Sequence, residues 1–96
     1  MEDEHLMREL LGTLLEDTER QLALLEAAIR DRDPERCKRL AHYAKGACAN
    51  IGANAAAAVL QRMELAAGSE AFDQCAASLA TLSGEMDRLR AEASLL

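Results

Sequence analysis

His42, Lys45 and Gly46 are the residues of this sequence whose types and spacing are best suited to chemistry. A neutral imidazole nitrogen can attack an electrophile or carry an anion. Lys45 follows by three positions, so on a helix its ammonium can hold an anion near the ring. Gly46 lies one turn beyond His42, where the missing side chain lets another molecule approach the backbone. The three residues indicate a nucleophilic site on the surface of a helix.

A helix over residues 34–50 is expected to hold these residues on its exposed side. At about 100° per residue, its core face consists of small and apolar residues: Cys37, Leu40, Ala44, Ala47, Cys48 and Ile51. The opposite face carries His42 among other residues: Lys38, Arg39, Lys45, Gly46 and Ala49. No Asp or Glu lies between Arg36 and Met63, although the chain has a net charge of −6. The sequence therefore predicts a basic patch around His42 that attracts an acidic partner surface.

Taken singly, each of these residues has an ordinary structural explanation. Most exposed histidines and lysines are only solvated, and a glycine inside a helix can be a tolerated defect. Gly46 nevertheless costs about 1 kcal/mol relative to alanine, which the chain uses freely nearby. The coincidence of the three residues on one face favours a functional site. His5 has no such neighbours and is expected to be a surface residue.

Helical periodicity runs through the whole chain and predicts an all-α fold, an antiparallel up-down-up-down four-helix bundle. One domain would span residues 1–96, with helices over approximately residues 4–30, 34–50, 54–67 and 70–94. The first helix has an inward stripe at three- and four-residue steps: Leu6, Leu10, Leu14, Thr18, Leu22, Leu25 and Ile29. Asp33 is expected to cap the second helix before Pro34, and Ser69 to cap the fourth.

Composition excludes several classes of protein. The negative net charge argues against nucleic-acid binding, and no apolar run approaches the ~20 residues of a membrane span. The N-terminal residues are acidic where a secretory signal would be basic. The three cysteines form no CxxC pair and are expected to be buried thiols in a reducing compartment. We therefore expect a soluble, cytoplasmic protein without membrane contacts.

Residues 40–53, LAHYAKGACANIGA, resemble the signature of the histidine-containing phosphotransfer (HPt) domain family, in which A-H-x-L-K-G is followed by N-[LI]-G-A. The resemblance extends to residues 15–18 and 22–29, to the turn at residues 33–35 and to residues 59–64, and so covers nearly the whole chain. Two positions depart from the pattern. Ala44 stands where a larger Leu is usual, and Tyr43 stands where Thr or Ser is frequent. Ala44 faces inward and is expected to affect core packing, whereas Tyr43 flanks the exposed face and is expected to affect which partner docks.

The resemblance implies that His42 accepts a phosphoryl group from the aspartyl phosphate of a receiver domain and passes it to another. Lys45 would stabilise the phosphoryl oxygens, and Gly46 would let the receiver approach closely. Docking would involve exposed neighbours on the same helix: Lys38, Arg39, Tyr43 and Ala49. The partners would be receiver domains of response regulators and hybrid histidine kinases, which supply Mg²⁺ and the catalytic groups. The chain itself would be a monomeric carrier without cofactor, metal or kinase activity, and its initial Met favours a free-standing protein.

Three alternatives belong to other classes. A helical bundle could dock on a kinase or receiver and modulate it without carrying phosphate, although such a protein needs no nucleophile. The dimerisation domain of a histidine kinase usually has an acidic residue after its histidine and a later proline, whereas Tyr43 follows here and Pro34 precedes. A metal-binding bundle needs Glu-x-x-His pairs on facing helices, and Glu2 with His5 is the only such spacing.

Overall fold

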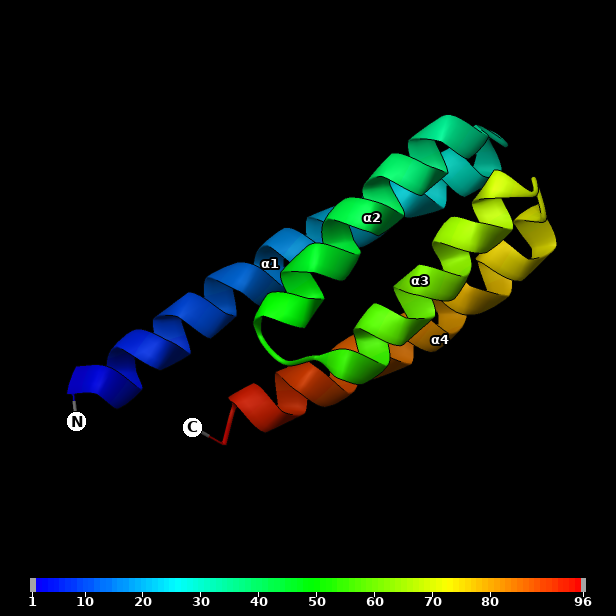
Figure 1. Ribbon diagram of the computed structural model, residues 1–96. Coiled ribbons are helices and arrows are strands. Elements are labelled where there is room, and N and C mark those ends of the chain that lie inside the picture. Colours follow the sequence, from blue (N-terminus) through cyan, green and yellow to red (C-terminus); the bar gives the residue numbers. More distant parts are fainter. Residues whose placement is uncertain (1, 96) are drawn as a thin grey trace.

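Four helices form the bundle expected from the sequence, in a computed structural model that describes residues 2–95, with side chains from His5 onward. Their bounds are α1 Glu2–Arg30, α2 Pro34–Asn50, α3 Asn54–Gly68 and α4 Phe72–Ala93. Successive helices run in opposite directions along a common long axis (Figure 1). Each helix packs on two others, in the pairs α1–α2, α2–α3, α3–α4 and α1–α4. The all-α, up-down-up-down fold is therefore confirmed, and the molecule measures 47 × 18 × 18 Å.

The turn before α2 is built as the sequence predicts. The Asp33 side chain accepts a hydrogen bond from the backbone N–H of Arg36 at 3.2 Å, and Pro34 is the first helical residue. Pro34 fits there because the first turn of a helix has no backbone acceptor for its N–H. After α2, Gly52 has φ +77°, a conformation that glycine adopts without strain. These two local signals fix both ends of the helix that carries His42.

The predicted cap of the fourth helix is wrong. Ser69 follows the end of α3, and its backbone N–H still bonds to the carbonyls of Leu65 and Ala66. The chain then turns through Glu70, which has φ +57°, and α4 begins at Phe72 after Ala71. Ser69 therefore completes the helix before it, because its backbone continues the last turn of α3.

The core is built from aliphatic side chains and thiols. The largest fully buried side chains come from all four helices: Leu25, Leu60, Met63, Leu82, Met86, Cys37, Cys48 and Cys75. The three cysteines are free and buried, as expected. Burial raises the pKa of the Cys37 thiol to about 11, so this side chain behaves as a small apolar residue.

The inward stripe predicted for α1 holds only over the later part of the helix. Leu15, Thr18 and Leu25 are buried, but Leu6 and Leu10 are more than half exposed. The reason is length, since α1 has 29 residues and α2 has 17, so the first turns of α1 extend past the end of α2 (Figure 1). None of the helices in residues 2–95 combines the length and apolar character needed to cross a bilayer.

Candidate functional site

The packing of α2 turns His42 toward solvent. The buried residues of α2 recur at three- and four-residue steps: Cys37, Ala41, Ala44 and Cys48. Leu40 and Ala47, predicted for the core face, are only half-buried at its margins. His42 lies away from this face, and its side chain is 70% exposed. The imidazole is therefore accessible to a second protein without any movement of the bundle.

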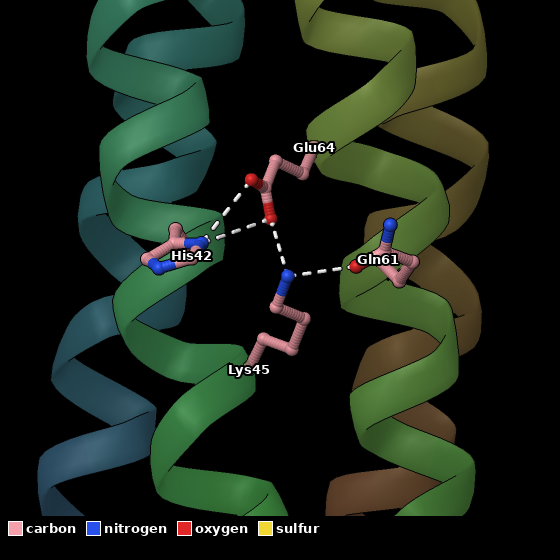
Figure 2. Close-up of polar contacts among 4 residues, drawn as sticks. All are labelled: His42, Lys45, Gln61 and Glu64. Carbon is pink, nitrogen blue, oxygen red and sulfur yellow. Dashed lines mark hydrogen bonds and ion pairs between the residues drawn. The ribbon is translucent and has the colours of Figure 1, made fainter.

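Glu64 of α3 binds the imidazole from the side. Nδ1 of His42 lies 3.3 Å from Oε1 and 3.2 Å from Oε2 of the Glu64 carboxylate (Figure 2). An ionised carboxylate can only accept hydrogen bonds, so Nδ1 carries the proton and donates. The neutral ring then keeps its lone pair on Nε2, the nitrogen remote from Glu64. The pairing across α2 and α3 thus determines which ring nitrogen of the neutral imidazole keeps an available lone pair.

Lys45 also points toward α3. Its Nζ donates to Glu64 Oε1 at 2.9 Å and to Gln61 Oε1 at 2.7 Å, and the side chain is 26% exposed (Figure 2). The Lys45 ammonium, with the His42 ring as a second donor, holds the pKa of Glu64 below its usual range against an opposing effect of burial. Glu64 therefore stays ionised while it binds both residues.

The predicted basic patch needs correction at its centre. The stretch free of acidic residues ends at Met63, and the next residue, Glu64, is the one that folds against His42 and Lys45. The charge of Lys45 is consequently paired with a carboxylate. Lys38 and Arg39 are exposed on α2, as predicted.

Gly46 lies on the wall of a shallow, open pocket between α1 and α2. The pocket is lined by seven residues: Leu14, Asp17, His42, Tyr43, Gly46, Ala47 and Asn50. A Cβ atom added at Gly46 would meet no atom within 4 Å apart from its own helix and chain neighbours. No contact with the described part of the chain therefore explains the glycine, and the open space beside it is available to another molecule.

Tyr43 of α2 lines the same pocket. Its hydroxyl donates a hydrogen bond to Asp17 Oδ2 of α1 at 3.1 Å, and this bond to the carboxylate raises the pKa of Tyr43. Of the four residues predicted for docking, Tyr43 is the one that lines the pocket. Ala49 is exposed farther along α2.

Sequence reasoning missed Glu64, Gln61 and Asp17. Gln61 and Glu64 are three residues apart, so they share one face of α3, and both belong to the stretch that resembles the family's third helix. That spacing could have indicated a polar face on α3, but the sequence does not show which face of α3 turns toward His42.

The remaining histidine takes no part in this site. His5 is exposed and pairs with Glu9 in the next turn at 2.9 Å. The metal-binding alternative is rejected because Glu2 and His5 alone have the required spacing, and the Glu2 side chain lies outside the described side chains. Among the side chains that the structure describes, no three His, Cys, Asp or Glu residues gather as a metal site requires.

Comparison with known proteins agrees with the geometry. The family model described as "Hpt domain" matches residues 9–92, which include the four residues drawn in Figure 2: His42, Lys45, Gln61 and Glu64. No curated protein and no solved structure matches the chain significantly.

Proposed function

The chain belongs to the Hpt domain family, whose role is histidine phosphotransfer in phosphorelays, and from this we propose that His42 relays a phosphoryl group between two receiver domains. The observation that carries the proposal is the pairing of an exposed imidazole with Glu64, which leaves Nε2 free. In the proposed step, Nε2 forms a bond to phosphorus as the bond from phosphorus to the receiver's aspartate oxygen breaks. The aspartate leaves as a carboxylate, and the reverse step loads the next receiver.

The surroundings of His42 suit such a step. Phosphoryl transfer depends mainly on in-line placement and on neutralisation of charge, so a single exposed nucleophile is sufficient when the partner brings the remaining groups. The receiver is proposed to supply Mg²⁺, and this chain to act as a carrier without kinase activity. Lys45 is proposed to stabilise the transferred phosphoryl oxygens, for which its ammonium must turn away from Gln61 or share its hydrogen bonds.

The open pocket beside Gly46 supports a docking role for this side of α2. A receiver must bring the phosphorus of its aspartyl phosphate within bonding distance of Nε2, and a glycine one turn from the histidine leaves room for that approach. Tyr43 is proposed to contact the receiver directly, and three exposed residues of α2 to surround the contact: Lys38, Arg39 and Ala49. We further propose that the carrier is a monomer and meets its partners in the cytoplasm.

The test is transfer from phosphorylated receiver domains in the presence of Mg²⁺. Label that is acid-labile and base-stable on the denatured chain should appear on the wild-type protein and on His5→Gln, the matched control, but not on His42→Gln. Absence of label from every receiver of the source organism would refute the carrier proposal. If His42→Gln then still inhibited a kinase or receiver, a docking protein that modulates without carrying phosphate would become the better explanation.

A further inference from the structure

The contact between Glu64 and His42 bears on the phosphorylated state as well as on the free ring. Both carboxylate oxygens of Glu64 lie within 3.3 Å of Nδ1, and the Glu64 side chain is only 23% exposed. We propose, on the basis of the relay function above, that Glu64 is a positioning residue that keeps the Nδ1 proton on phosphorylated His42 and thereby keeps the phosphoryl group labile above neutral pH.

The proton matters because of the group that leaves. When water attacks phosphorus, the bond from phosphorus to Nε2 breaks and its electron pair returns to Nε2. A ring that holds the Nδ1 proton departs as neutral imidazole, and orthophosphate carries the remaining charge and the protons from water. A ring without that proton would have to leave as an imidazolate anion, which is far less stable. This is why phosphohistidine is labile in acid and stable in base.

The geometry favours retention of the proton. A phosphorylated ring protonated at Nδ1 is cationic, so its bond to the Glu64 carboxylate is charge-assisted, and such bonds are about twice as strong as neutral ones. An amide at residue 64 could accept the same hydrogen bond without the negative charge. The ring should therefore hold its proton to a higher pH with Glu64 than with a glutamine there.

Other charged groups around the ring limit the size of the effect. From α2, Lys45 pairs with the same carboxylate, and Lys38 and Arg39 lie one turn earlier. From α1, Asp17 lines the pocket next to His42 and binds Tyr43, whereas α4 packs on α1 and α3. Because the Lys45 ammonium offsets part of the Glu64 charge and His42 is mostly exposed, we expect a shift of about 0.5 to 1 pH unit.

The experiment loads the ring chemically, so it needs no receiver. In a His5→Gln background, phosphoramidate phosphorylates His42 with loss of ammonia, and the decay of phosphohistidine is followed by ³¹P NMR from about pH 5 to about pH 10. Glu64→Gln should move the midpoint of the rate profile down by about 0.5 to 1 unit, which makes decay roughly three- to tenfold slower at alkaline pH. Gln61→Leu is the matched control, since it removes a Lys45 partner and leaves the bond between Glu64 and His42; its midpoint should equal that of the parent.

Coincident midpoints for the parent and Glu64→Gln, with both proteins folded by circular dichroism, would overturn the inference. An equal downward shift in Gln61→Leu would also overturn it, because the effect would then pass through Lys45. As a second measurement, the decay of phosphohistidine at alkaline pH is compared between the folded parent and the parent unfolded in urea. Decay should be slower in the unfolded protein, and an unchanged rate would contradict the role of Glu64. Failure of receivers to phosphorylate His42 would refute the relay alone, because chemical loading reports on Glu64 independently.

Discussion

Substitution of Gly46 by alanine is expected to have opposite effects on the stability of the fold and on the docking of a receiver. A glycine inside a helix is about 1 kcal/mol less favourable than alanine. At Gly46 the added Cβ has open space around it, and the backbone does not need the left-handed conformation that favours glycine. The free energy of unfolding should therefore increase by about 0.5 to 1 kcal/mol, because the propensity gain is not offset by a clash. For a domain of this size the melting temperature would rise by roughly 2 to 8 °C.

The same methyl group should obstruct a docked receiver. Overpacking a close contact costs about 1 to 3 kcal/mol, so phosphotransfer from a receiver should slow by on the order of tenfold or more. Loading of His42 by phosphoramidate should be unchanged, since that donor is small enough to reach Nε2 without contacting Gly46. The mutation is thus expected to make the protein more stable and a poorer partner at the same time.

Gly84→Ala in α4 is the matched control. Gly84 is also exposed inside a helix with no atom within 4 Å of an added Cβ, and α4 does not pack on the helix that carries His42. It should show a similar gain in stability and normal transfer. Stability is measured by urea unfolding followed by circular dichroism, because the chain has no tryptophan. Normal receiver transfer by Gly46→Ala would refute the close-approach argument, and a loss of stability would refute the reading of its local geometry.

Burial and charge at other positions give three further expectations. Lys45 is the main cause of the lowered pKa of Glu64, so the ionised carboxylate stabilises the fold above roughly pH 4.3, and this contribution is lost as the pH falls through the lowered pKa. The free energy of unfolding in urea should therefore depend less on acidic pH in Glu64→Gln than in the wild type. An identical dependence in the two proteins would contradict the ion pairing. Burial raises the pKa of Cys37 to about 11 and also raises the pKa of Cys48 and of Cys75. Iodoacetamide at about pH 8 should therefore label the three cysteines only after unfolding. Rapid labelling of the folded protein would argue against a core that contains these thiols. Leu25→Ala, at a site with 0% exposure, should lower the free energy of unfolding by about 2 to 5 kcal/mol. Leu10→Ala, at a site with 56% exposure, should change it by no more than about 0.5 kcal/mol. Equal losses of stability would show that the first turns of α1 are covered in solution.

The parts of the fold that local chemistry determines could be predicted from the sequence. The start of α2 follows from Asp33 and Pro34, whose side chains act within one turn, and its end follows from a glycine with positive φ. The exposure of His42 follows from helical periodicity, because the buried residues of α2 recur on the other side. Ser69 shows the limit of such signals, since a serine between two helices suits the end of one as well as the start of the next.

The parts that depend on how helices pack could not be predicted in the same way. Whether Leu6 and Leu10 are buried depends on which end of α1 lies level with α2, and a hydrophobic stripe does not contain that information. Likewise, Gln61 and Glu64 share a face of α3, but only the rotation of α3 against α2 brings that face to His42. The proposed nucleophile could therefore be found from one helix, whereas the groups that bind its ring could not.

The position of Glu64 changes the expected electrostatics of docking. The charges of Lys45 and Glu64 offset each other before transfer, so in the proposed relay the attraction of an acidic receiver depends on Lys38 and Arg39, one turn earlier in α2. A phosphoryl group on Nε2 then adds about −1.5 to −2 charges on the side of the ring away from Glu64, and a ring that keeps its Nδ1 proton offsets part of this with one positive charge. Lys45 is the cation already beside the ring, and the new anion competes with Glu64 and Gln61 for it. The loaded and unloaded carriers thus present different charges over the same pocket, which gives a receiver a physical basis for binding one form more tightly than the other.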